Sequence, residues 1–271
     1  FSDLDARLET AALQRLVRWF TLPDIGGICG QREIEAEGGS TESGQRSYIC
    51  LDSWIKLMEN RLGAISSNDG KLYAVRRDLF RPIHPTATDD LYNALTVVDG
   101  GYRFLFEPDA RAWIQRPSRN IRHDLHRRRR IVLRSMSGIF ARPRILLTTR
   151  FGGFGPRLVI NKVFRRALAL FLLGLLVASG SLALSHEGME PVFAAQILLY
   201  GGIAAYGSIL GGRLEEVLPR PLQRLGQAGF YFGWGLLGML WGLSGFITGK
   251  RIARWEPLKT DPAPDGEKKR S

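Results

Sequence analysis

Two acidic motifs and one basic run are the residues of this chain whose types and spacing suggest chemistry. Asp3 and Asp5 form a D-x-D motif, Asp90 follows a second aspartate, and four consecutive arginines end at Arg130. A D-x-D at the end of a strand can hold Mg²⁺ or Mn²⁺, which prefer acidic oxygen ligands, against a diphosphate. A carboxylate at a later helix start can act as a general base. The order of these motifs, ahead of a long apolar region, is more informative than any one of them.

The arginine run cannot act as a single site, because neighbouring residues on a helix point in different directions. We assign Arg130 to the charge of a diphosphate, and Arg127 lies one turn earlier and can join it. Asp90 is assigned the role of base, and Asp89 that of a helix cap. The remaining arginines are expected on a solvated or lipid-facing side of the helix.

Short helices and strands must position these motifs over the first half of the chain. The apolar spacing predicts an alternation of the two, which is typical of a sheet flanked by helices. The expected helices are 8–20, 48–62 and 88–98, and the expected strands are 25–30, 72–75 and 102–106.

The second half of the chain reads as membrane-associated. Residues 118–140 form a basic amphipathic pattern, which is typical of a helix lying in the membrane interface. Three apolar segments approach the roughly 20 residues that a spanning helix needs. Glycines within them are expected to allow close helix packing. The three segments are about 166–186, 192–212 and 228–248, and a basic tail at 250–271 is expected to be disordered.

The formal charge of +12 favours anionic partners. Because apolar segments are also present, we expect phosphorylated ligands and membrane lipid rather than nucleic acid. Cys29 and Cys50 show no metal-ligand spacing and are expected to be free thiols.

The order of motifs resembles that of the membrane-embedded family 2 glycosyltransferases, the group of cellulose, chitin and hyaluronan synthases. Asp3-Leu4-Asp5 stands at the family's D-x-D, Thr88-Asp89-Asp90 at its T-E-D, and 127–131 at its Q-x-x-R-W. The segment 67–77 is similar to the acceptor-side strand and turn, which places Asp69 near the acceptor. The segment 254–257 is similar to the C-terminal tryptophan motif, which makes Trp255 a second acceptor-side residue.

Two departures from the family pattern carry expectations of their own. Arg127 replaces the glutamine and Ile131 the tryptophan of Q-x-x-R-W. The lost tryptophan favours a single sugar addition, whereas the arginine helix joined directly to spans favours a polymer synthase. The chain also starts at the D-x-D, so we expect a C-terminal fragment that lacks the strands binding the nucleotide base and is inactive alone.

The resemblance implies a fold of class α/β, a partial GT-A-like catalytic domain followed by an interfacial amphipathic helix and about three transmembrane helices. The expected divisions are 1–117, 118–163 with its R-x-x-R-I, 164–249 and the tail. The implied activity is metal-dependent, inverting transfer of a sugar from a nucleotide-diphosphate sugar, such as a UDP-sugar, to a polysaccharide or lipid-linked acceptor. The implied location is multi-pass in the inner (plasma) membrane, with the catalytic part cytoplasmic.

A noncatalytic membrane protein with a basic domain that binds lipid or a partner is the alternative. It explains the charge and the apolar segments but not two acidic motifs in this order.

Overall fold

The structure is a computed structural model that describes residues 1–34, 40–114, 121–206 and 219–251. Its first half is built on a four-stranded sheet with the order β1-β4-β2-β3. The central strands β2 and β4 are parallel, and the outer strands β1 and β3 pair antiparallel to them. An isolated bridge between Ser2 and Leu72 lies next to β3. The strands are β1 (Ala6–Leu8), β2 (Ile25–Ile34), β3 (Tyr73–Val75) and β4 (Arg103–Ile114).

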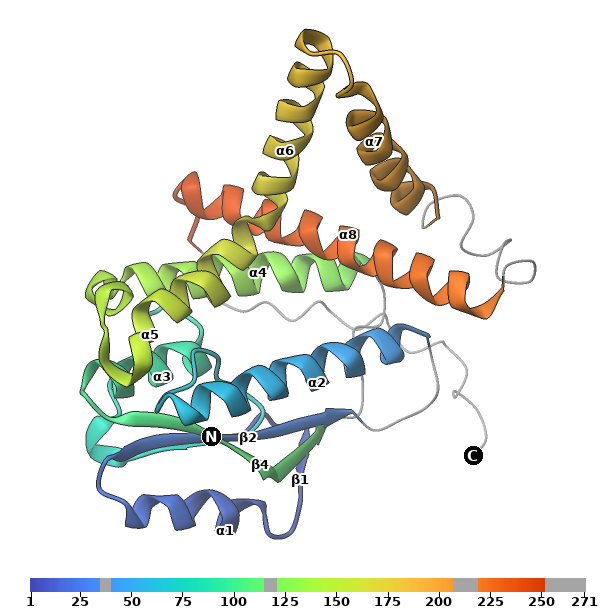
Figure 1. Cartoon of the computed structure of the whole chain (residues 1–271). Helices are drawn as coiled ribbons and strands as arrows, with labels where there is room; N and C mark the ends of the chain where they lie inside the picture. The colour runs from blue at the N-terminus through green and yellow to red at the C-terminus, as the bar shows by residue number, and fades with distance from the viewer. Residues whose placement is uncertain (35–39, 115–120, 207–218, 252–271) are drawn as a thin grey trace, which may run out of the picture.

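Helices cover both faces of the sheet (Figure 1). The short helix α1 (Ala12–Val17) lies on one face, and α2 (Ser40–Arg61) and α3 (Asp89–Asp99) lie on the other. Successive side chains of a strand point to opposite faces, so β4 places Leu105 in the α1-side core and Phe104 and Phe106 in the other core. Both faces are therefore buried, as expected for a parallel pair.

This arrangement confirms the expected α/β class and differs from the sequence predictions in its bounds. The predicted helix 8–20 is divided into a strand, α1 and the 3₁₀ helix Arg18–Thr21. Ala6–Leu8 pairs with the far end of β4, so tertiary strand pairing overrides the local helical pattern. The predicted strand 102–106 extends to Ile114 for the same reason.

A third layer of helices lies on the α2 and α3 side (Figure 1). It contains α4 (Ile121–Phe140), the 3₁₀ helix Pro143–Leu147, α5 (Arg150–Leu158) and α8 (Arg220–Ile247). A π-helix, Val159–Phe164, joins α5 to α6 (Arg165–Ser185). Helices α6 and α7 (Glu190–Ala205) rise from this layer as a hairpin.

Helix α8 lies along α4 through a face of glycines spaced three and four residues apart. A Cβ atom added at Gly242 would lie 2.6 Å from the Cβ of Val132 and 2.9 Å from the carbonyl oxygen of Arg129. One at Gly238 would lie 3.0 Å from the Cβ of Arg128. The absence of side chains at these positions lets the two backbones approach closely, which agrees with the packing role expected for the glycines of 233–249. The same expectation fails for Gly201 and Gly202 of α7, where an added Cβ would have nothing within 4 Å.

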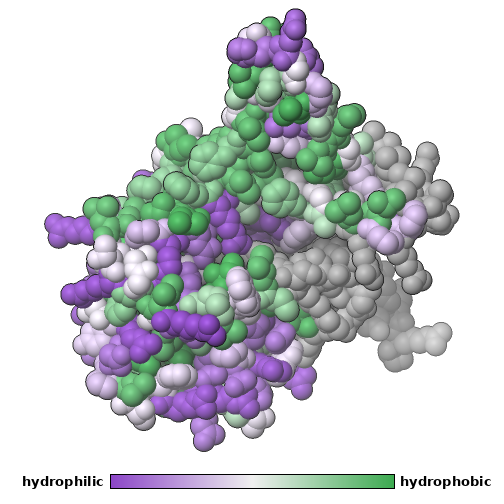
Figure 2. Space-filling view, in the orientation of Figure 1, coloured by the Kyte–Doolittle hydropathy of each residue, from purple (hydrophilic) through white to green (hydrophobic). Residues whose placement is uncertain are grey.

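The apolar residues of the hairpin are exposed. Hydrophobic side chains gather over the upper helices, whereas the α/β layers below are mostly hydrophilic (Figure 2). By length and composition, two helices in the described ranges can cross a membrane, Arg150–Ser185 and Pro221–Ile247. The sequence predicted three, and the 16 described residues of α7 are too few for the same test.

Candidate active site

Asp90 lies in the first turn of α3, where the sequence predicted the base. Its Oδ1 accepts a hydrogen bond from the backbone N–H of Leu91 at 2.6 Å, and its carbonyl oxygen accepts one from Asn68 Nδ2 at 2.9 Å. Burial raises the pKa of the Asp90 carboxyl, and the neighbouring carboxylates of Asp89 and Asp69 raise it further. A carboxylate in this setting binds a proton more tightly than an exposed aspartate does.

Asp69 lies beside Asp90, in the turn that precedes β3. Its Oδ2 is 3.3 Å from Arg32 Nε at the far end of β2, and its Oδ1 accepts a hydrogen bond from the backbone N–H of Lys71 at 3.2 Å. A Cβ atom added at Gly70 would lie 3.6 Å from Asp90 Oδ2. The turn therefore packs directly against the candidate base, and the acceptor-side role of Asp69 stays a prediction.

Asn68 adds an unsatisfied acceptor to the same turn. Its Oδ1 is buried and has no hydrogen-bond partner among the described residues, although its Nδ2 holds the backbone of Asp90. A buried polar atom normally has a partner, so this oxygen is an exception in the packing of the turn. The sequence analysis did not assign Asn68, since a single asparagine in an N-D-G turn is explained by the turn alone.

The arginines on one face of α4 approach this site. Arg134 donates from Nε to the carbonyl oxygen of Ala87 at 3.0 Å, and its Nη2 donates to the same oxygen. Arg127 and Arg130 precede Arg134 by seven and four residues, so the three share one helix face. Burial lowers the pKa of Arg130, and the cations Arg134 and Arg127 lower it further. Arg134 thus lies beside the segment that leads into α3, and Arg130 and Arg127 extend its positive face along α4.

The other two arginines of the run are turned to α8. The Arg128 guanidinium lies 4.7 Å from the ring centroid of Tyr231, and its Nε pairs with Asp124 at 2.5 Å. The Arg129 guanidinium lies 4.2 Å from the ring centroid of Trp241. The expectation that the four arginines diverge is confirmed. The expected solvated or lipid-facing position of Arg128 and Arg129 is wrong, because both guanidinium groups stack on aromatic rings of α8.

Asp3 and Asp5 converge on the side chain of Lys71. The Lys71 Nζ lies 2.7 Å from Asp3 Oδ2 and 2.9 Å from Asp5 Oδ1. The two carboxylates stay largely accessible, at 49% and 70% exposure. One cation of the protein therefore contacts both members of the D-x-D.

The segments that carry the two acidic motifs both contact Tyr73. Burial raises the pKa of Tyr73, and the carboxylates of Asp89, Asp90 and Asp3 raise it further. The Tyr73 hydroxyl accepts a hydrogen bond from Asn93 Nδ2 at 3.0 Å. The Phe1 ring stacks on Tyr73 with centroids 4.8 Å apart, and Asn93 of α3 bonds its hydroxyl, so the fold brings the N-terminal segment and α3 together although they are more than 80 residues apart in the sequence.

The π-helix ahead of α6 contacts the two serines that precede the Asn68–Gly70 turn. Asn161 Nδ2 donates to Ser66 Oγ at 2.7 Å, and Lys162 Nζ donates to Ser67 Oγ at 2.6 Å. A π-helix is rare and often occurs at functional sites. Asn161 and Lys162 are polar residues between apolar ones. This break in the apolar pattern could have predicted a contact with the α/β part of the chain.

The remaining residues singled out in the sequence are the two cysteines and Trp255. Both cysteines are free thiols, as expected, and burial raises the pKa of Cys29 to about 12. Trp255 lies outside the described residues, so its acceptor-side role stays a prediction. In the described part of the chain no cluster of three or more His, Cys, Asp or Glu forms a metal site, so the D-x-D offers two protein ligands.

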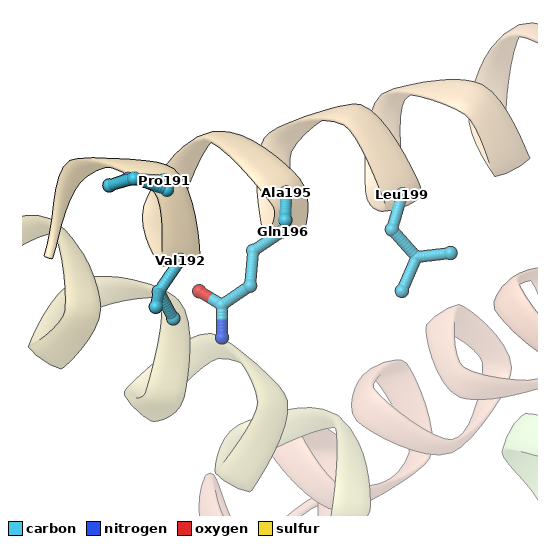
Figure 3. Close-up of a pocket in the computed structure, with 5 residues that line it drawn as sticks. All are labelled: Pro191, Val192, Ala195, Gln196 and Leu199. Atoms are coloured by element: carbon cyan, nitrogen blue, oxygen red, sulfur yellow. The ribbon is translucent and has the colours of Figure 1, made fainter.

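A groove on α7 is separate from this chemistry. Pro191, Val192, Ala195, Gln196 and Leu199 line it, and only Gln196 is polar (Figure 3). The Oε1 of Gln196 accepts a hydrogen bond from Ser179 Oγ on α6 at 2.5 Å. The glutamine therefore ties the hairpin together, as polar residues between apolar helices commonly do.

Comparison with known proteins supports the fold. No family model matches the chain, and no curated protein matches it. The solved structure of the mannosyltransferase PcManGT from Pyrobaculum calidifontis, in complex with GDP-Man and Mn²⁺, is similar with a TM-score of 0.61 and 18% identity. The match covers 91% of this chain and 61% of that one. The chain thus has a glycosyltransferase fold and spans about three fifths of that protein.

Proposed function

We infer that the chain is part of a membrane-embedded family 2 glycosyltransferase. It transfers a sugar, with inversion, from a nucleotide-diphosphate sugar to a polysaccharide or lipid-linked acceptor at the cytoplasmic face of the inner membrane. The observation that carries this proposal is the partly buried Asp90 carboxyl, with its raised pKa, which packs against the Asn68–Gly70 turn and follows the segment that Arg134 of α4 holds.

Asp90 is positioned to remove a proton from the acceptor. The acceptor hydroxyl oxygen attacks the anomeric carbon, the bond from that carbon to the diphosphate oxygen breaks, and the hydroxyl proton passes to Asp90. A carboxylate with a raised pKa is the stronger base, which helps this step.

The leaving diphosphate gains negative charge as that bond breaks. Arg130 and Arg127, on the face that Arg134 fixes against Ala87, supply positive charge to it. Asp3 and Asp5 would hold a divalent ion, because one cation already contacts both carboxylates. When bound, that ion supplies additional positive charge to the diphosphate. UDP- and GDP-linked sugars are the donor candidates, the second because the similar mannosyltransferase binds GDP-Man.

The membrane assignment is supported by the exposed apolar hairpin. Leu173, Leu175 and Val177 of α6 are 48–70% exposed, as is Leu198 of α7 at 74%. Apolar surface of this extent is unfavourable in water and matches a lipid environment. The hairpin continues directly from the π-helix that contacts Ser66 and Ser67, so insertion would place the site beside the bilayer.

Transfer of a labelled sugar tests the proposal. UDP- and GDP-sugars are offered with Mg²⁺ or Mn²⁺ to the longest natural protein that contains these residues, in lipid or detergent. We expect metal-dependent transfer that is lost in Asp90→Asn and retained in the neighbouring control Asp89→Asn. Lipid binding without any transfer, together with equal behaviour of the two variants, would instead favour the noncatalytic membrane protein.

A further inference from the structure

Lys71 occupies the position between the two D-x-D carboxylates. Its Nζ contacts Asp3 Oδ2 and Asp5 Oδ1 at ion-pair distance, and its side chain is only 17% exposed. The ammonium is therefore a cation of the protein itself at the point where a shared metal ligand set would be centred.

The Lys71 backbone is fixed, whereas its side chain is long and unbranched. The N–H of Lys71 donates to Asp69 Oδ1, and its carbonyl oxygen accepts a hydrogen bond from Ser2 Oγ at 3.0 Å. Leu72, the next residue, forms the bridge with Ser2. The Nζ can therefore leave the carboxylates by rotation about side-chain bonds, without any change in the strand.

We propose that Lys71 competes with the divalent metal for Asp3 and Asp5 and makes metal binding depend on the donor diphosphate. The proposal rests on the proposed function. Two carboxylates supply two of the six or more oxygen ligands that such an ion takes, and the ammonium already neutralises half of their charge. A free ion therefore gains little, whereas an ion that arrives with a diphosphate brings further oxygen ligands and a negative partner for the displaced Nζ.

The competition predicts that metal binding in the absence of donor improves when the lysine charge is removed. Lys71→Met keeps the length of the side chain and removes the ammonium. Mn²⁺ alone is the probe, and its affinity for the chain in detergent is measured from the electron paramagnetic resonance signal of free Mn²⁺. We expect Lys71→Met to bind Mn²⁺ about tenfold more tightly than the unmodified chain, since one positive charge next to the ion is lost. Lys71→Arg, which keeps the charge, should bind as weakly as the unmodified chain.

Three further variants separate the possible outcomes. Lys71→Gln repeats the test with a polar side chain, in case methionine disturbs the fold, and circular dichroism checks the fold of each variant. Equal Mn²⁺ affinity of the unmodified chain, Lys71→Met and Lys71→Gln overturns the role of Lys71, while a loss of Mn²⁺ binding in Asp5→Asn would still support the D-x-D assignment. If Asp5→Asn/Lys71→Met still binds Mn²⁺ more tightly than the unmodified chain, the ion binds elsewhere. Both the proposed competition and the metal role of Asp5 are then wrong.

Discussion

The carboxylates of the D-x-D and the carboxylate of Asp90 have opposite surroundings. Asp3 and Asp5 are accessible and face an ammonium group. Asp90 is enclosed by the turn before β3 and by the segment that α4 holds, and the nearest charges are those of other carboxylates. The first setting favours an ionised pair that binds a cation, and the second favours uptake of a proton. The groups around each aspartate thus determine whether it favours binding a cation or binding a proton.

The largest effect is expected from Asp90→Asn, which is nearly isosteric but cannot take up the acceptor proton. Sugar transfer at saturating donor should fall by roughly two to four orders of magnitude, the usual range for loss of a general base. Donor binding, measured by titration calorimetry, should stay close to normal. A variant that loses nucleotide binding and keeps its turnover would reverse the roles of the two acidic regions.

The arginines of α4 test whether the charge beside Asp90 serves the leaving group. Arg130→Ala should weaken binding of the nucleoside diphosphate by roughly 10- to 100-fold, because a hydrogen bond to a charged group contributes about 1.5–3 kcal/mol. Arg129→Ala is the matched control, since Arg129 is stacked on Trp241 of α8. Calorimetric titration with GDP and UDP measures both. Equal losses in the two variants would mean that the run acts through helix packing alone.

The enclosure of Asp90 depends on α4, and α4 is in turn backed by α8. Gly242→Ala places a methyl group 2.6 Å from the Cβ of Val132, so the helices must separate, at a cost of about 1–3 kcal/mol. Thermal unfolding in detergent should show this loss. Gly201→Ala on α7, where nothing lies within 4 Å, should show little change. If both variants unfold alike, close α4–α8 packing does not contribute to stability.

The smallest effect concerns stability and its dependence on pH. The pKa of Asp90 is raised above its ordinary value of 3.8 in the folded chain, so this group favours folding below that value and loses the contribution as pH rises through the raised pKa. Asp90→Asn removes the ionised, buried carboxylate. Chemical unfolding should therefore show the variant to be more stable than the unmodified chain near pH 7, with the difference disappearing below about pH 4. A difference that does not change with pH would contradict the enclosed setting.

Several local features of this molecule were predictable from residue spacing. The helix predicted at 88–98 is observed as Asp89–Asp99, and the strand predicted at 72–75 as Tyr73–Val75. Each depends on a turn or cap next to a short apolar pattern, which acts within a few residues. The helix predicted at 8–20 was wrong at its start, because β1 forms only by pairing with β4, about a hundred residues later in the chain.

In the candidate site, too, some features were predictable from the sequence and others were not. The acidic motifs and the arginine run were identified by residue type and order, but the environment of each carboxylate required partners far away in the sequence. Lys71 pairs with Asp5 across 66 positions, and Arg134 holds Ala87 across 47. Such contacts leave no periodic signal, since nothing in the intervening residues must repeat for the two ends to meet.

Residue types and their order in the chain are sufficient to predict an α/β part carrying acidic motifs, followed by a basic helix and apolar segments. Only the tertiary structure decides which arginines share the face of Arg134 and which turn to α8, which cation lies on the D-x-D, and which carboxylate packs against the turn before β3. The physical reason is that hydrophobic patterning is a property of neighbouring residues, whereas the charge and solvation of a side chain depend on everything packed around it.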